Sequence, residues 1–350
     1  MHGSRLRHES RRNYRRRWIT IILMLSVILV VFNYLGLTFD LPSSTNGLKI
    51  SSTVFELQPK RPNKAIIATT LQKSPDSADW IIDLLPDWQP YIFMADGTVN
   101  DAPMLSNQHA HKIPLALNRG REAASYLSFI ITHYYDLPEY MVFIHGDRYQ
   151  THNADIAQMY DTLPLIQKLD LDYVDLEGYV NLRCNWKHCP EPYIVPRPGH
   201  EDSIWEAHGE YVKAWEFIFP NKTLPEKVAA PCCAQFAVDR RTIHRWPVAQ
   251  YELIRAWMWS RDGDIASMKS GIILEYMWHI LFGKPAYWCA PVKPCYCGTW
   301  NMCDLDCDET KGWCKGRIWT SDPPPSLPSN WPEEGQDGLT WPMEGWEKNM

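Results

Sequence analysis

Downstream of a polar segment, the chain alternates short apolar strands with amphipathic helices, and this order is the strongest constraint on its fold. Apolar, β-branched runs at 64–70, 91–96 and 141–145 have the length of strands. Between these runs, the segments at 76–85 and 118–134 have apolar side chains at helical spacing. We therefore predict an α/β fold in which a mostly parallel, doubly wound sheet is flanked by helices.

The second half of the chain continues this pattern less regularly. A strand is expected at 233–238, and helices are expected at 207–219, 251–259 and 267–282. The net charge is −6, so a general attraction to nucleic acid is not expected. The sequence leaves the oligomeric state open.

The amino terminus predicts a membrane anchor. A basic tail at 1–17 precedes a run at 18–37 that holds no ionisable residue except Tyr34 and is long enough to span a bilayer. The excess of arginine before the run places the tail in the cytosol and the rest of the chain in the lumen. We therefore expect a single-pass type II protein of the Golgi or endoplasmic reticulum. Its further parts are a stem at 38–63, a luminal domain at 64–315 with a cysteine-rich end, and a disordered tail at 316–350.

Ten cysteines all fall in the part assigned to the lumen, where an even count predicts disulfides. A zinc cluster near the end of the domain is the alternative. Vicinal cysteines do not pair easily, so Cys232 and Cys233 are each expected to bond elsewhere. Asn221 begins the triplet Asn-Lys-Thr and is a candidate for N-linked glycosylation. The other cysteines are Cys184, Cys189, Cys289, Cys295, Cys297, Cys303, Cys307 and Cys314.

A charged turn at the start of the helix at 118–134 is the first candidate site. Asn118 is a plausible helix cap, and Arg119 and Arg121 add forked donors at the positive end of the helix dipole. Such a turn suits a diphosphate. A capped helix with two solvated arginines is an equally good interpretation.

Titratable residues follow the strand at 141–145 directly. His145 and Asp147 are spaced to enter one loop, with Arg148 and His152 close behind. Imidazole and carboxylate ligands suit Mn²⁺ or another divalent metal, which could bridge the phosphates of a donor. The alternative is a buried histidine beside an ion pair of Asp147 with Arg148.

Two further groups carry candidate residues. Gln235 could line a pocket, although a plain core strand is as good an interpretation. Glu275 and His279 are four residues apart and would share a helical face, as base and ligand or as a buried hydrogen-bonded pair.

Several segments resemble a fungal family of membrane-anchored proteins, the domain-of-unknown-function family 3431, over about residues 64–307. They are ALNRGREAASYLSFIITHYYDLPEYMVFIHGDR, GYVNLRC, CCAQFAV and LEYMWHILFGK. A more distant similarity links the NRGRE turn, the helix and the strand ending in FIH to rhamnan-synthesis glycosyltransferases of the GT-A class. The fold that this similarity implies is GT-A-like.

The same resemblance implies roles for the candidate residues. Asn118, Arg119, Arg121 and Arg148 would bind the phosphates of a nucleotide-sugar donor. The metal would be held by His145, Asp147, His152 and His279, although His145 stands where GT-A enzymes carry an aspartate. Glu275 and Asp147 would be catalytic, and Gln235 and Arg183 would line the acceptor pocket.

We therefore expect a glycosyltransferase that moves a sugar from a nucleotide-sugar donor to a luminal or secondary-metabolite acceptor. Two rivals remain open. One is a non-catalytic luminal binding or scaffold protein, and the other is a metal-dependent tailoring enzyme that uses His145, Asp147 and His152. Geometry separates the tailoring enzyme from the transferase. The tailoring enzyme needs His145, Asp147 and His152 to converge on one point, whereas the transferase needs Arg119, Arg121 and Asp147 to line one cleft.

Overall fold

We describe a computed structural model of the chain. The described residues are 63–71, 77–95, 112–115, 117–153, 160–186, 189–261 and 263–315. The expected basic tail, the tail at 316–350 and the stem up to residue 62 lie outside these ranges. All described elements belong to one compact unit.

The predicted fold class needs one correction, which concerns the transmembrane helix. Within the described ranges, no helix is both long and apolar enough to cross a bilayer. The run at 18–37, on which the expectation rested, lies outside the described residues.

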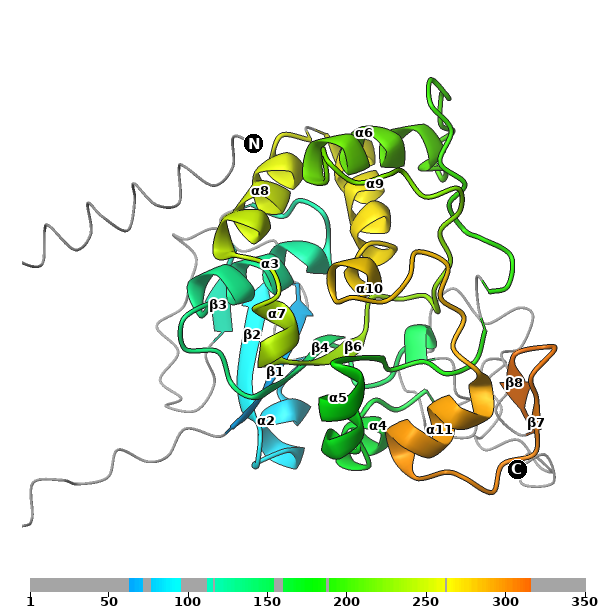
Figure 1. Cartoon of the computed structure of the whole chain (residues 1–350). Helices are drawn as coiled ribbons and strands as arrows, with labels where there is room; N and C mark the ends of the chain where they lie inside the picture. Colours follow the sequence, from blue (N-terminus) through cyan, green and yellow to red (C-terminus); the bar gives the residue numbers. More distant parts are fainter. Residues whose placement is uncertain are drawn as a thin grey trace, which may run out of the picture. The chain divides into compact units, whose positions relative to one another are not determined.

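The predicted sheet is confirmed as mostly parallel and has six strands in the order β3-β2-β1-β4-β6-β5. Strands β3, β2, β1 and β4 run parallel, and β6 is antiparallel to both of its neighbours. Figure 1 shows the sheet crossing the middle of the domain. The strands are β1 Lys64–Thr70, β2 Gln89–Met94, β3 Lys112–Pro114, β4 Tyr140–His145, β5 Tyr179–Asn181 and β6 Phe236–Asp239.

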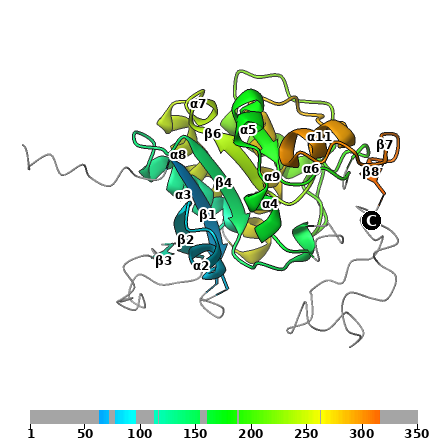
Figure 2. The same cartoon turned by 90° about the horizontal axis from the view of Figure 1, so that it is seen from below.

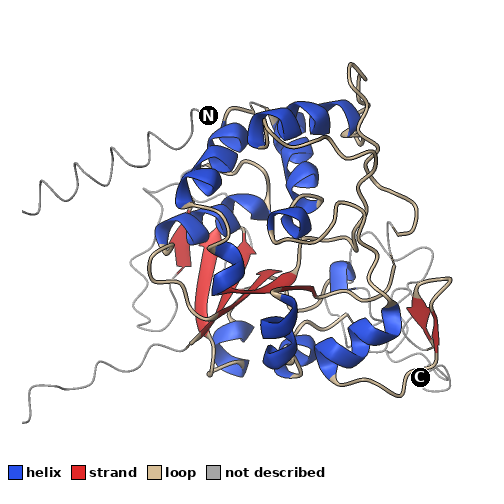
Figure 3. Cartoon of the chain, in the orientation of Figure 1, coloured by secondary structure: helices blue, strands red, loops and turns tan. Residues whose placement is uncertain are grey.

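Helices cover both faces of the sheet, so that successive strand residues are buried on alternate sides (Figures 2 and 3). Ile67 and Phe143 belong to the core under α3, α6, α8, α9 and α10, whereas Ile66 and Val142 belong to the core with α2, α4, α5 and α11. This double burial explains the continuous apolar runs of β1 and β4. The helices are α2 Trp80–Leu84, α3 Glu122–Thr132, α4 Leu163–Gln167, α5 Leu171–Glu177, α6 His208–Ile218, α7 Arg240–Ile243, α8 Val248–Trp259, α9 Asp264–Glu275, α10 Trp278–Leu281 and α11 Val292–Trp300, with a 3-10 turn, η1, at Thr151–Asn153.

Two differences from the predicted helices bear on the candidate site. The expected helix at 267–282 is broken, because α9 ends at Glu275 and α10 starts only at Trp278. The cap of α3 is Arg121, in a left-handed conformation with φ 56°, and not Asn118. The turn before α3 is held by α9, since the N–H of Gly120 donates to Ser267 Oγ at 3.0 Å.

All ten cysteines form disulfides, which confirms the first prediction and overturns the zinc cluster. The expectation for Cys232 and Cys233 was wrong, because they pair with each other. The backbone makes this possible by entering the left-handed region at Cys233 and Ala234, with φ of 90° and 49°. The other bonds are Cys184–Cys295, Cys189–Cys289, Cys297–Cys303 and Cys307–Cys314, the last linking the short strands β7 Cys307–Asp308 and β8 Trp313–Cys314.

Candidate functional site

The candidate site lies where the direction of strand addition in the sheet reverses. From β1 the chain adds β2 and β3 on one side and then crosses through α3 to β4 on the other side. Open α/β sheets bind ligands at the carboxyl ends of the strands at such a point. Gly146 keeps the two strand ends close, because its N–H donates to the carbonyl of Thr69 at 2.8 Å.

A cavity of about 400 Å³ opens at these strand ends. Its wall includes Asn118 and Arg121 before α3, Glu122 in the first turn of α3, and His145 and Asp147 after β4. The structure therefore brings together residues from both ends of the motif that the sequence singled out. We call this space the strand-end cavity.

A second cavity, of about 180 Å³, shares Arg121, Glu122 and His145 with the first. We call it the inner cavity. Glu275 at the end of α9 and the disulfide Cys232–Cys233 lie in its wall. Its remaining lining residues are His152, Tyr193, Gly271, Ile272 and Tyr276.

Glu275 is the carboxylate in the inner cavity whose acidity is altered toward neutrality. Its carboxylate accepts a hydrogen bond from the N–H of Cys233 at 2.5 Å. The pKa of Glu275 is raised to about 7, chiefly by burial and also by the charge of Glu122. The bond from Cys233 and the charges of Arg183 and Arg121 oppose this rise. A carboxylate with this pKa can accept or give a proton near neutrality.

Gln235 fixes the position of His145 from beneath the cavity. The side-chain oxygen of buried Gln235 accepts the backbone N–H of His145 at 3.3 Å, and its amide donates to Asn153 Oδ1 at 2.8 Å. The ring of His145 also donates to the carbonyl of Cys233 at 3.2 Å and stacks on His152 at 4.7 Å. Gln235 thus supports the cavity wall, whereas the sequence analysis placed it in an acceptor pocket.

Arg183 lies behind the vicinal disulfide. Its side chain is 3 % exposed, and Nη1 contacts Cys232 Sγ and lies 3.1 Å from Cys233 Sγ. Arg183 therefore places a buried positive charge against the sulfur atoms, and it is not among the residues that line either cavity.

Three expected site residues are engaged elsewhere. Arg119 donates to the carbonyl of Trp259. Arg148 forms a two-point ion pair with Asp161, at 3.0 and 2.7 Å, so it does not pair with Asp147. His279 is fully buried and donates to the carbonyl of Ala286 at 3.0 Å, and burial lowers its pKa to about 4.

The described residues do not form the metal site that the sequence suggested. Within the described ranges, His145, Asp147 and His152 do not converge as a set of three ligands. The one set of three ligand-type side chains found there is Cys232, Cys233 and Glu275, in which the two sulfurs are bonded to each other. The donor set thus fits a divalent ion poorly, and the prediction of Mn²⁺ gains no support from it.

Sequence reasoning missed part of the inner cavity. Tyr193 and Tyr276 stack on each other at 4.7 Å and line its wall, and neither was among the candidate residues. Glu122 was given no role in the site, although it lines both cavities. Its position four residues after Asn118 was the only available signal.

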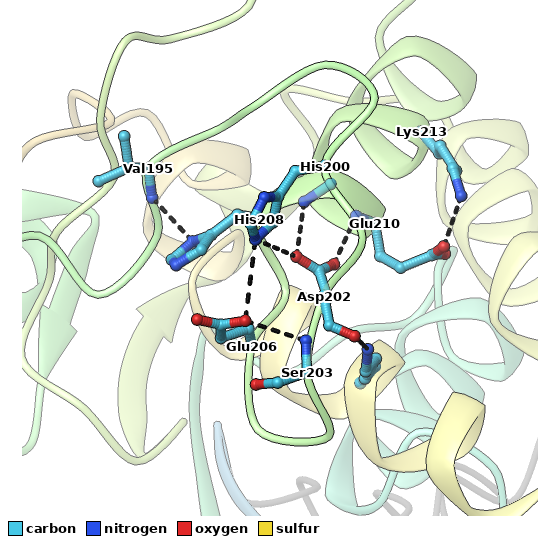
Figure 4. A network of polar contacts seen from close by, with 10 residues as sticks. Val195, His200, Asp202, Ser203, Glu206, His208, Glu210 and Lys213 are labelled. Atoms are coloured by element: carbon cyan, nitrogen blue, oxygen red, sulfur yellow. Dashed lines mark hydrogen bonds and ion pairs between the residues drawn. The ribbon is translucent and has the colours of Figure 1, made fainter.

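A separate polar cluster precedes α6 and is built to hold that helix (Figure 4). Buried Asp202 accepts from the N–H groups of Gly209 and Glu210, at 2.9 Å each, and so satisfies free donors at the start of α6. His200 lies 3.8 Å from Asp202 and 3.7 Å from Glu206. These contacts give the cluster a structural role. Asn221 is exposed after α6, so its predicted glycan would have room.

The chain is similar to a known protein family. A family model described as "Protein of unknown function (DUF3431)" matches residues 66–298. No curated protein and no solved structure gives a significant match.

Proposed function

The chain belongs to the DUF3431 family of proteins of unknown function, and we propose that it is a transferase that moves a sugar from a nucleotide-sugar donor to an acceptor hydroxyl. One observation carries the proposal: Glu275, a carboxylate with a pKa of about 7, lines a cavity that shares a wall with the strand-end cavity, and Arg121 belongs to that shared wall. Such an arrangement suits a reaction in which a proton leaves one substrate while a negative group leaves the other.

The donor diphosphate is assigned to the strand-end cavity. Arg121 supplies a permanent positive charge there, and the start of the eleven-residue helix α3 adds the positive end of its dipole. The cavity volume of about 400 Å³ is within the range of ligand pockets. Asn118 adds hydrogen-bonding groups at the mouth of the same space.

The acceptor is assigned to the inner cavity, where Glu275 acts as the general base. The acceptor hydroxyl gives its proton to Glu275 as its oxygen bonds to the anomeric carbon of the donor. The bond from that carbon to the diphosphate oxygen breaks, and nucleoside diphosphate leaves beside Arg121. Attack from the side opposite to the leaving group makes the reaction inverting.

The stacked rings of Tyr193 and Tyr276 provide a flat wall for the acceptor. Aromatic rings pack well against the apolar face of a ring-shaped ligand, with their hydroxyl groups left to hydrogen-bond. The acceptor class that fits best is therefore a cyclic molecule with a free hydroxyl group.

Donor hydrolysis tests the proposal without knowledge of the acceptor. The purified chain is incubated with each common nucleotide sugar, with and without Mn²⁺, and free nucleoside diphosphate is measured. We expect release with at least one donor, and Glu275→Gln should lower the rate by about two to four orders of magnitude. Gln keeps an oxygen that can accept from Cys233, so the fold around it should be retained.

Arg148→Met serves as the control, because Arg148 pairs with Asp161 away from both cavities. It should leave the turnover number unchanged. Tight donor binding without turnover in the parent chain would favour the non-catalytic binding protein. Neither binding nor turnover with any donor, in folded protein, would remove the transferase proposal.

A further inference from the structure

We propose that the Cys232–Cys233 disulfide is a reducible site for a small thiol and that its closed ring sets the positions of Glu275 and His145. The observation behind it is that one residue, Cys233, contacts both side chains through its backbone. The disulfide also lines the inner cavity that these two side chains share.

The two backbone contacts of Cys233 point in different directions. Its N–H donates to Glu275 at 2.5 Å, and its carbonyl accepts from the ring of His145 at 3.2 Å. Cys233 has φ 90°, and Ala234 has φ 49°, a region that residues with a Cβ rarely adopt. Such conformations persist only where the surroundings impose them, and here a covalent ring joins the two neighbouring side chains.

The surroundings of the sulfur atoms favour reduction. Thiol exchange produces a leaving thiolate, and a nearby cation stabilises that thiolate. Buried Arg183 places its guanidinium group 3.1 Å from Cys233 Sγ and also contacts Cys232 Sγ. A carboxylate oxygen of Glu275 lies within 4.8 Å of both sulfurs, close enough to exchange a proton with a thiol through small movements.

Access to the site limits the size of the reductant. Cys232 and Cys233 are only 3 % and 7 % exposed, so a reagent reaches them through the inner cavity of about 180 Å³. That space admits a small thiol and excludes the active site of a protein oxidoreductase. The co-reactant is therefore a low-molecular-weight thiol of the cysteine or glutathione type.

The exchange balances in two steps. A thiolate of the small thiol attacks one sulfur of the pair, the bond between the cysteines breaks, and the other cysteine leaves as a thiolate beside Arg183. A second thiol molecule then attacks the mixed disulfide and releases the oxidised small thiol. Two electrons reach the cysteine pair, and the protons lost by the two thiols are taken up by the cysteines or remain in solvent.

Reduction opens the ring and removes the covalent reason for the left-handed backbone at Cys233. We expect the N–H of Cys233 to turn away from Glu275 and its carbonyl to turn away from His145. If Glu275 is the base of the proposed transferase, which this consequence presupposes, reduction lowers the turnover number. The reducibility of the pair does not depend on that function.

Differential alkylation of the folded chain tests reducibility directly. The protein is treated with rising concentrations of 2-mercaptoethanol, trapped with iodoacetamide and analysed by peptide mass. We expect Cys232 and Cys233 to be alkylated before Cys184 and Cys295, which are similarly buried at 2 % and 8 % but line neither cavity. Alkylation of both pairs at the same reductant concentration would overturn the proposal.

Variants of Arg183 test whether its positive charge, and not only the access of the thiol to the disulfide, sets the rate of reduction. Arg183→Gln should slow alkylation of Cys232 and Cys233 by about threefold to tenfold, because the leaving thiolate loses its cation. Arg183→Lys keeps the charge and should react within about twofold of the parent chain. Equal rates in all three proteins would contradict the role given to Arg183.

The positional effect has its own readout. The double variant Cys232→Ser, Cys233→Ser should shift the ionisation of Glu275, followed by NMR of isotope-labelled glutamate, by at least about half a pH unit. Cys297→Ser with Cys303→Ser opens a disulfide that lines neither cavity and should leave that ionisation unchanged. If the ionisation of Glu275 does not shift in the first variant, the Cys232–Cys233 disulfide does not position Glu275. This conclusion holds whether or not transferase activity is found.

Discussion

The backbone N–H of Cys233 donates a 2.5 Å hydrogen bond to the carboxylate of Glu275. This contact joins the end of α9 to the turn before β6, segments that are 42 residues apart in the sequence. It favours the ionised carboxylate, whereas burial and the charge of Glu122 favour the protonated one. Because burial is the largest effect, the balance leaves Glu275 partly protonated at neutral pH.

This balance predicts how Glu275 affects stability. The pKa of Glu275 rises from 4.5 to about 7 on folding, so the folded chain holds more protons than the unfolded chain between these pH values. The contribution of Glu275 is fully present below pH 4.5 and is lost as the pH rises to about 7. Relative to the parent chain, Glu275→Gln should gain about 2 kcal/mol over this range, after allowance for solvent at the cavity.

Urea unfolding of both proteins with intact disulfides, at several pH values from 4.5 to 7, checks this expectation. His279 gives both proteins a pH dependence of the opposite sign, because burial lowers its pKa from 6.5 to about 4. Stability from neutral His279 is therefore lost as the pH falls through 6.5 toward 4. Parallel pH profiles for the parent chain and Glu275→Gln would show that Glu275 keeps an ordinary pKa.

Removal of the charge at Arg121 and at Arg148 should have different effects on the binding of a diphosphate. Arg121 lines both cavities, so Arg121→Met should weaken binding of uridine diphosphate by about tenfold to a hundredfold. Arg148 pairs with Asp161, so Arg148→Met should leave that affinity unchanged and lower the melting temperature by a few degrees. Isothermal titration and thermal melting give the two quantities. Equal losses of affinity would mean that the strand-end cavity does not hold the diphosphate.

The same two arginines illustrate how much the sequence could predict. The strands β1 and β4 were predicted from apolar runs that are typical of burial on both faces. The alternation of helices and strands predicted a mostly parallel sheet, but not the order of its strands. The partner of Arg148 was not predictable, because Asp161 lies 13 residues away and no local period relates the two. Motif reasoning found Arg121 but treated its neighbour Arg119 as equivalent.

The vicinal cysteines and Glu275 mark a second limit. Adjacent cysteines normally bond elsewhere, and only the left-handed backbone at Cys233 reverses that expectation. Helical periodicity placed Glu275 and His279 on one face, but α9 ends between them. Tertiary packing determines both the pairing of the vicinal cysteines and the end of α9. A local sequence pattern such as a four-residue spacing does not predict such packing.

The disulfides should differ in their contribution to stability according to the loops that they close. Cys184–Cys295 spans 111 residues, and Cys307–Cys314 spans 7. By loop entropy, removal of the first should cost roughly 5 kcal/mol and removal of the second roughly 2 kcal/mol. Urea unfolding of the two paired Cys→Ala variants measures both. A larger loss from Cys307 and Cys314 would mean that local packing outweighs loop closure.

Gly146 should be required for the strand-end cavity. A Cβ at this position would lie 2.7 Å from the carbonyl oxygen of Thr69, a backbone atom that cannot move without separating β4 from β1. Gly146→Ala should therefore cost about 1–3 kcal/mol and displace the neighbouring His145 and Asp147. Gly199→Ala is the matched control, because Gly199 has φ 74° but nothing within 4 Å of an added Cβ.

The control should lose about 1 kcal/mol through its left-handed backbone and should keep its affinity for uridine diphosphate. Gly146→Ala should lose affinity as well as stability, because the atoms that it displaces line the cavity. Thermal melting and isothermal titration on both variants separate the two effects. If Gly146→Ala melts early but binds uridine diphosphate as tightly as Gly199→Ala does, the close contact of β1 with β4 serves the fold alone, and the diphosphate site must be sought elsewhere.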